Sequence, residues 1–571
     1  MSEMKEAAII GSGFGGSISA CRLAKKWPGE VVVLERGKRY PMGSFPRTPH
    51  DFARNFWNVP KEDRKAGMGA SADETHGLFD LRNYKGIDAV LCAGLGGGSL
   101  IYANVYMEPP EAVFDERWPA SVKKPALAPY YRVAKEVLGA RPIPRNQDPR
   151  RTITRTELFA SVAKEMGKKS ELVDINVFFG KDFNDPLAIG HQDKNRYGAV
   201  QTSCVYCAEC DIGCNTQSKN TLDLNYLFAA EHRYGAQILT EHLVEKIVPV
   251  NADHEDDPSA DGAFGYRVYY DDLRPGSRAS GSLLAKRVVV SAGALGSTEL
   301  LFQCRDIHKT LPRVSTRLGQ RFSGNGDFLS FVINGKREVN PNYGPVITQR
   351  IDYGLFTNPT PGHSFIMEDA SYPAFTAWFT EGIKPGILKF GSVRRAIKRL
   401  WGWAKGWTTG SVGAAFSEIL AGDLSQNTSV LLCMGLDKAN GVMTLDKNGH
   451  LDVAWPVRDN RSLYDGIVAA ARQFKDKVGG HFLSTPTWWW PFRQNVTVHA
   501  LGGCALGVSA STGVTSADPS TLGQVFGYRG LYVIDGAIIP TAVGANPTAT
   551  ISALAEMAAE GITGVAPDAH L

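Results

Sequence analysis

The sequence GSGFGG, residues 11–16, decides the fold of this chain. It follows a short apolar run, residues 7–10, that is typical of a buried strand. Residues 17–26 come next, and their apolar spacing predicts a helix. A strand, a glycine turn and a helix in this order are the setting in which G-x-G-x-x-G binds a dinucleotide. The first 26 residues therefore predict a nucleotide-binding βα unit.

Each glycine of the motif has a separate role in such a unit. Gly11 permits the tight turn, Gly13 lets the backbone approach a pyrophosphate, and Gly16 lets the helix pack on the strand. A second apolar run, residues 31–34, ends at Glu35. A carboxylate there can accept both hydroxyl hydrogens of an adenosine ribose and would repel a 2′-phosphate. The pattern predicts an adenine-dinucleotide site and disfavours NADP.

Length and composition restrict the class of protein. A chain of 571 residues is too long for one ordinary core, so we expect two or more domains. Its 62 basic and 58 acidic residues give a net charge of +4, without a basic arm, which disfavours nucleic acid as a partner. The sequence has no apolar run long enough to span a membrane, and the first predicted strand leaves no room for a signal peptide. We therefore expect a cytoplasmic protein, in which the nine cysteines are not a disulfide framework.

Four further segments carry a family resemblance. GLGGGSLIYAN, residues 94–104, has glycines that would let the backbone pass against a flat ring system, although a mobile surface loop is the alternative. This segment resembles the first signature of the glucose–methanol–choline (GMC) flavin oxidoreductases. VVVSAGALGSTELL, residues 288–301, resembles the second signature, and residues 530–556 resemble the C-terminal segment that closes on the flavin. HALGGC, residues 499–504, resembles the sterol-oxidase branch of the family.

The resemblance implies an architecture of two domains. An α/β FAD-binding domain of the Rossmann-like type would comprise residues 1–310 and residues 491–571. An α+β substrate-binding domain with a mainly antiparallel sheet would comprise residues 311–490 and cover the flavin. Within the first part, residues 41–85 would form a lid region and residues 200–222 a cysteine-rich segment.

The resemblance also implies FAD as the cofactor and assigns residues to it. Gly11, Gly13, Gly16 and Glu35 would hold the ADP half. Val244 would offer its backbone to adenine, although a buried strand residue is the alternative. The other contacts, along the pyrophosphate and the isoalloxazine ring, would come from Gly97, Gly98, Asn104, Asp535 and Gly536.

Oxidation of an alcohol requires a proton to leave oxygen and a hydride to leave carbon. In the resembled family, the positions of His499 and Asn546 face the flavin nitrogen that accepts hydride. An asparagine cannot act as a base at neutral pH, so His499 or Glu368 would take the proton. Glu368 lies in a segment that resembles the sterol-oxidase strand carrying a carboxylate toward the substrate. A strand alternates its faces, so Asp369 is the alternative, and a solvent-facing pair is another.

Cys204, Cys207, Cys210 and Cys214 form C-x2-C-x2-C-x3-C, the spacing of a bacterial ferredoxin run. Cys204, Cys210 and Cys214 also resemble, in their spacing, the three ligands of a 3Fe–4S cluster in bacterial FAD glucose dehydrogenases, which are GMC relatives. We therefore favour an iron–sulfur cluster, 3Fe–4S ahead of 4Fe–4S. A structural zinc and cysteines without a metal are the alternatives. A cluster would pass electrons to an external acceptor, such as a protein, so that dioxygen would not be required.

Residues 384–407 interleave lysines and arginines with tryptophans and contain no acidic residue. This composition suits peripheral contact with a membrane interface, although a docked amphipathic helix or a subunit interface would give the same pattern. Taken with the motifs, the sequence predicts FAD-dependent oxidation of a bulky apolar alcohol, with a 3β-hydroxysteroid as the best single substrate. A polyol or sugar dehydrogenase and an FAD photoenzyme or lyase on the same fold are the alternatives.

Overall fold

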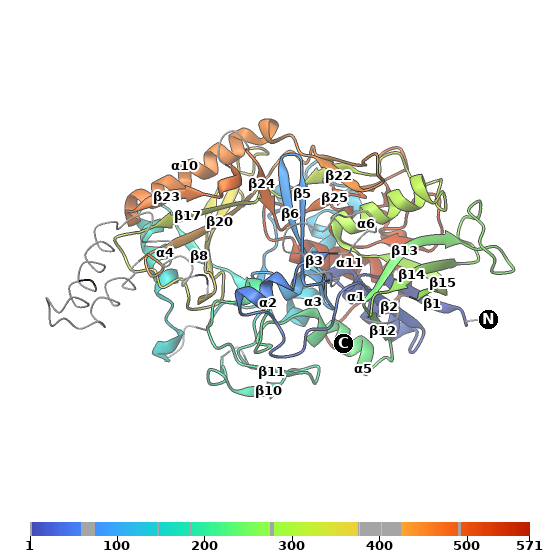
Figure 1. The fold of residues 1–571 in the computed structure, drawn as a ribbon, viewed down its shortest axis with the longest axis horizontal. Helices are drawn as coiled ribbons and strands as arrows, with labels where there is room; N and C mark the ends of the chain where they lie inside the picture. Colours follow the sequence, from blue (N-terminus) through green and yellow to red (C-terminus); the bar gives the residue numbers. More distant parts are fainter. Residues whose placement is uncertain are drawn as a thin grey trace.

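The computed structural model describes residues 3–58, 75–144, 148–182, 184–274, 279–374, 376, 401, 424–488 and 493–571. Two large sheets organise it, one toward each side of Figure 1. Its α-helices are α1 (Phe14–Lys26), α2 (Pro49–Ala53), α3 (Lys124–Leu138), α4 (Thr154–Glu165), α5 (Tyr226–His232), α6 (Gly293–Phe302), α10 (Arg461–Val478) and α11 (Thr548–Thr563).

The first sheet has seven strands and positions the glycine turn. Five of them run parallel, and an antiparallel pair extends the sheet beyond its longest strand. Across the sheet the strands are β12 (Gln237–Thr240), β2 (Val31–Glu35), β1 (Lys5–Ile10), β15 (Ser280–Val290), β14 (Tyr266–Asp272) and β13 (His242–Pro249), with β28 (Leu531–Val533) also paired to β15. β1 lies between β2 and β15, so the turn after β1 opens at the middle of the parallel strands, as a Rossmann-like sheet requires.

The glycines of the first turn allow close packing. The helix α1 begins at Phe14, earlier than the predicted Ser17, so that Gly15 and Gly16 belong to its first turn. A Cβ atom on Gly15 would lie 1.6 Å from the carbonyl oxygen of Ile534, and one on Gly16 would lie 2.0 Å from that of Gly11. These contacts exclude any side chain, because they are far shorter than van der Waals separation.

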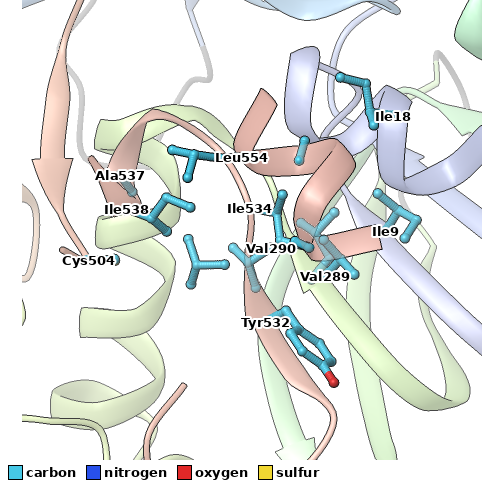
Figure 2. Packing of buried hydrophobic residues seen from close by; sticks show 14 of the residues in the cluster. Ile9, Ile18, Val289, Val290, Cys504, Tyr532, Ile534, Ala537, Ile538 and Leu554 are labelled. Atoms are coloured by element: carbon cyan, nitrogen blue, oxygen red, sulfur yellow. The ribbon is translucent and has the colours of Figure 1, made fainter. Parts of the chain in front are cut away.

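Apolar side chains from segments distant in the sequence fill the space between the first sheet and its helices. Figure 2 shows Ile9, Val289 and Val290 of the strands near Ile18 of α1 and Leu554 of α11. All five are buried, because the parallel strands are covered on both faces and their sequences are nearly continuous apolar runs. The C-terminal helix is therefore part of the nucleotide-binding core.

The second sheet has six strands, and every neighbouring pair is antiparallel. The helices α4 and α10 pack on one of its faces. Its strands in order are β23 (His481–Ser484), β17 (Phe328–Ile333), β20 (Ser429–Gly435), β19 (Phe365–Ala370), β18 (Gln349–Tyr353) and β8 (Ser170–Leu172). The edge strand β8 and the helix α4 come from residues before 311. Residues from the range assigned to the FAD-binding domain therefore also contribute to this sheet and to the helices that cover it.

A small sheet lies between the two large ones. β24 (Asn495–Thr497) pairs in parallel with β6 (Ile87–Cys92), which pairs with β5 (Phe79–Tyr84). Parallel strands end at the same edge of a sheet, so the segment after β6, which contains Gly97 and Gly98, leaves it at the same end as His499 after β24.

Two of the predicted segments lie mainly or partly outside the described residues. The basic, tryptophan-rich segment 384–407 is described only at Trp401, and the lid region 41–85 lacks residues 59–74. The described part of the lid region contains α2, β5 and the short strands β3 (Trp57–Asn58) and β4 (Thr75–His76). Among the described residues, none of the helices combines the length and the apolar character that crossing a membrane requires.

Candidate active site

Two glycine turns meet at the end of β1. A Cβ atom on Gly97 would lie 2.7 Å from the Cα atom of Gly13, so the two turns are in direct contact. In contrast, a Cβ atom on Gly13 or on Gly98 would meet no atom within 4 Å. Gly97 has a φ of +52°, in the region that favours glycine. The backbone therefore leaves open space where the sequence predicts a pyrophosphate, and a side chain at Gly13 or Gly98 would fill it.

Glu35, at the end of β2, lies beside the first of these turns. One carboxylate oxygen accepts hydrogen bonds from the backbone N–H of Ser12 at 3.0 Å and from its hydroxyl at 2.5 Å. The other oxygen accepts from the N–H of Gly37 at 2.8 Å. Burial raises the pKa of Glu35, while the bonds from Ser12 and Gly37 oppose that rise. Each oxygen retains acceptor capacity, so the carboxylate fits the hydroxyl groups of a ribose.

Asn104 and Val244, two other predicted cofactor residues, have different surroundings. Asn104 is fully buried with a φ of +72°, and its amide lies beside the thiol of Cys210. Val244 is half-buried on β13 and packs against the main core.

Asp535 and Gly536 join the C-terminal segment to the start of α6. The Asp535 carboxylate accepts hydrogen bonds from the N–H of Gly293 at 2.9 Å and from the hydroxyl of Ser297 at 2.5 Å. It also caps the short turn that begins at Gly536, and burial raises its pKa to about 6. This carboxylate therefore holds together two segments that the sequence assigns to the flavin.

A four-residue loop, Gly324 to Asp327, connects the segment of His499 to the segment of Asn546. It links β16 (Gln320–Ser323) to β17, and Asn325 and Gly326 both have positive φ. The side-chain NH₂ group of Asn325 donates to the carbonyl of Ala545 at 2.8 Å. Its amide oxygen accepts from the backbone N–H groups of Val543 and Gly544 at 3.0 and 2.9 Å. The loop thereby holds the backbone directly before Asn546. The sequence analysis did not identify Asn325 or Asp327 as site residues, although the GNGD pattern marks a tight turn.

Asp327 binds the predicted base. Its Oδ1 atom lies 2.8 Å from Nδ1 of His499, which follows β24. Its Oδ2 atom accepts from the hydroxyl of Thr497 at 3.0 Å and from the N–H of Val498 at 2.9 Å. The side chain of Asp327 is 3% exposed and that of His499 is 15% exposed, so the pair is shielded but the imidazole remains accessible.

Glu368 and Asn546 meet on the other side of this loop. The amide of Asn546 donates to Oε2 of Glu368 at 3.5 Å, and both residues are buried. The second oxygen of Glu368 and the amide oxygen of Asn546 have no partner among the described residues. Burial raises the pKa of Glu368 to about 8, and the carboxylates of Asp369 and Asp327 add to that rise. The pair therefore offers unsatisfied polar atoms and a carboxyl group able to exchange a proton near neutral pH.

The alternation of β19 distinguishes Glu368 from Asp369. Asp369 lies on the opposite face, where it forms a buried ion pair with Arg155 of α4 at 3.2 Å. It also accepts hydrogen bonds from the backbone N–H groups of Thr348 and Gln349. Neither carboxylate faces solvent, since their exposed fractions are 0% for Glu368 and 1% for Asp369. Geometry thus places Glu368, and not Asp369, against Asn546.

The four clustered cysteines line one cavity of about 20 Å³ and are free thiols. Burial raises the pKa of Cys204 and of Cys210, and it raises the pKa of Cys207 to about 12. Within the described residues, however, no three side chains of His, Cys, Asp or Glu are arranged to hold a metal ion. The donor chemistry of the cavity suits a cluster, but the sulfur atoms do not form a metal site as they stand.

A buried lysine connects the cysteine segment to the glycine segment. The ammonium group of Lys219 donates to the carbonyls of Leu100, Tyr102 and Cys210 at 2.9, 3.0 and 2.6 Å. Burial lowers the pKa of Lys219 to about 8. The cysteine cavity is therefore adjacent to the segment 94–104, which the sequence assigns to the flavin.

Comparison with known proteins gives this geometry its context. Models of the GMC oxidoreductase family match residues 77–305 and residues 447–555. A cholesterol oxidase of Mycobacterium tuberculosis is 30% identical, over 97% of this chain and 90% of its own length. This chain belongs to the GMC oxidoreductase family. A cholesterol oxidase of Acinetobacter baumannii is 28% identical, over 96% of this chain and 93% of its own.

The GMC fold is also seen in a solved structure of low sequence similarity. A pyridoxine 4-oxidase from "Mesorbium loti" aligns with a TM-score of 0.56 at 14% identity, over 98% of this chain and 99% of its own. The predicted family and fold class are confirmed, and this GMC oxidoreductase is an FAD-dependent enzyme of the alcohol-oxidising class. The open space beside Gly13 and Gly98 and the acceptor capacity of Glu35 are consistent with that cofactor.

Proposed function

We propose that this GMC oxidoreductase oxidises a bulky apolar alcohol, a 3β-hydroxysteroid in the first instance, to the ketone. The contact between Asn546 and Glu368 carries the proposal, because it sets an orienting amide beside a carboxyl group of raised pKa. The nearly full-length similarity to proteins named cholesterol oxidase favours a sterol over a polyol or a sugar. FAD, when bound, supplies the acceptor for the hydride.

The proposed roles divide the reaction among three side chains. His499 takes the proton from the substrate hydroxyl, and Asn546 orients the substrate oxygen through its amide. Glu368 is an auxiliary acid–base group, and with a 3-keto steroid bearing a neighbouring double bond it would carry a proton between carbons. Asn546 cannot replace His499 as the base, because an amide does not accept a proton at neutral pH.

The test is reduction of the flavin in the absence of oxygen. The purified holoenzyme would be mixed with cholesterol, a long-chain primary alcohol or glucose, and loss of the oxidised flavin absorbance would be followed. We expect cholesterol to bleach the flavin fastest and His499→Ala to slow bleaching at least about 100-fold with FAD still bound. Faster bleaching by glucose, or full activity in His499→Ala, would refute the proposal.

We further propose that the four cysteines hold an iron–sulfur cluster that provides a one-electron exit to an external acceptor. Four free thiols around one buried cavity, next to the flavin segment, support it. Iron and acid-labile sulfide would be measured on protein purified without oxygen, with Cys210→Ser as the variant and Cys433→Ser, a buried cysteine of β20, as the matched control. We expect iron and sulfide in the wild type and the control and their loss in Cys210→Ser. Their absence from the wild type would remove the cluster.

A further inference from the structure

The carboxylate of Asp327 lies between two hydrogen-bond donors and the imidazole of His499. Its Oδ2 atom accepts from the hydroxyl of Thr497 at 3.0 Å and from the N–H of Val498 at 2.9 Å, and its Oδ1 atom lies 2.8 Å from Nδ1 of His499. An ionised carboxylate has no proton to donate. Nδ1 of His499 must therefore carry the proton, and the lone pair of the neutral imidazole lies on Nε2.

The surroundings keep this arrangement in place. Asp327 is held in a turn whose Asn325 is bonded to the backbone beside Asn546, and the backbone N–H of His499 donates to the hydroxyl of Thr497 at 3.0 Å. The side chain and the backbone of His499 are thus both held by the same few residues. An imidazole base held by a buried carboxylate acquires a defined tautomer and a counter-charge for its protonated form.

We propose that Asp327 is a positioning residue that fixes the tautomer of His499 and stabilises its protonated form during alcohol oxidation. This inference rests on the role proposed for His499. In the step, the hydroxyl proton of the substrate would move to Nε2 of His499 and the C–O bond would become a carbonyl, with bound FAD supplying the hydride acceptor. The carboxylate of Asp327 would compensate the positive charge on the imidazole.

The substitution Asp327→Asn tests the tautomer directly. The remaining oxygen of the amide would stay with the N–H of Val498, because that backbone donor has no other acceptor in this network. The new NH₂ group would then face Nδ1 of His499 and require it to accept, which moves the imidazole proton to Nε2. The base would be lost while the shape of the site is retained.

The first measurement is independent of turnover. The holoenzyme would be labelled with ¹⁵N-histidine, and the signal of His499 assigned by its absence in His499→Ala. We expect the Nδ1–H tautomer in the wild type and the Nε2–H tautomer in Asp327→Asn. An Nε2–H tautomer in the wild type would overturn the inference even if Asp327→Asn did not fold.

The second measurement is the rate of flavin reduction by cholesterol, or by whichever alcohol of the panel reduces the wild type fastest. We expect Asp327→Asn to lower kcat at least about 100-fold with little change in KM, and Asp327→Glu to recover part of it. Asp437→Asn is the matched control, because Asp437 is also buried and accepts from Gly326 of the same turn without touching His499. We expect this control to stay within threefold of the wild type.

The outcomes separate the two proposals. A rate within threefold of the wild type in Asp327→Asn, with His499→Ala strongly impaired, would overturn the role of Asp327 and leave the proposed base intact. An unimpaired His499→Ala would instead refute the proposed function. Equal losses in the Asp437→Asn control would show that the turn is merely structural, which would also overturn the inference.

Discussion

The raised pKa of Glu368 makes the stability of the enzyme depend on pH in a way that one substitution should remove. Burial and the neighbouring carboxylates raise this pKa from 4.5 to about 8. Between these values the folded protein keeps the proton, whereas the unfolded chain releases it. The unfolded state then binds fewer protons, so the free energy of unfolding falls as the pH rises.

The size of the effect follows from that shift. Each unit of pKa difference corresponds to about 1.4 kcal/mol, and most of the interval lies between about pH 5 and about pH 8. Because of Glu368, the free energy of unfolding should therefore fall by on the order of 3 kcal/mol between about pH 5 and about pH 8. In Glu368→Gln the side chain keeps its size and its contact with Asn546 but cannot ionise. We therefore expect the free energy of unfolding of the variant, relative to the wild type, to rise by that amount from about pH 5 to about pH 8.

Urea denaturation of both proteins at about pH 5 and about pH 8 would measure this difference. Other buried carboxyl groups, such as Asp437, also titrate in the range, so only the difference between the two proteins reports Glu368. Glu255→Gln, on an exposed loop, is the matched control and should follow the wild type at both values. If Glu368→Gln showed the same pH dependence as the wild type, the buried carboxyl would be ionised at neutral pH and our reasoning would be wrong.

Three further substitutions probe the framework of the site. Gly16→Ala would place a methyl group 2.0 Å from the carbonyl oxygen of Gly11, so we expect loss of bound FAD, measured as the flavin-to-protein absorbance ratio. Arg155→Met would leave Asp369 buried without its counter-charge and should lower the free energy of unfolding by about 3–5 kcal/mol; an unchanged urea midpoint would contradict this. Asn325→Ala would leave two backbone N–H groups before Asn546 without an acceptor, so we expect the free energy of unfolding to fall by about 2–4 kcal/mol and kcat to be lower. A variant equal to the wild type in both would disprove the coupling.

Much of the fold was predictable because its signals are local. The apolar run, the turn at Gly11 and the carboxylate at Glu35 lie within one βα unit, where spacing along the chain translates directly into position. It was less predictable which strands belong to the same sheet. Residues 170–172 join the second sheet as an edge strand, and a three-residue strand has too little pattern to reveal its distant partner.

The predicted site residues show the same difference between what local motifs and what tertiary contacts reveal. His499, Asn546 and Glu368 were named from motifs, and their roles remain proposals. The resemblance favoured Glu368 over Asp369, but it could not show which face of β19 meets α4. The structure places Asp369 on that face, in an ion pair with Arg155, and Glu368 against Asn546.

The sequence by itself determined the nucleotide turn, the family and the presence of four closely spaced thiols, because each is a pattern of adjacent residues. Only the tertiary structure decided that Asp327 binds His499 and that Asn325 holds the backbone before Asn546. Those contacts join residues far apart in the chain, and a hydrogen bond between them depends on where sheets and turns place the two atoms.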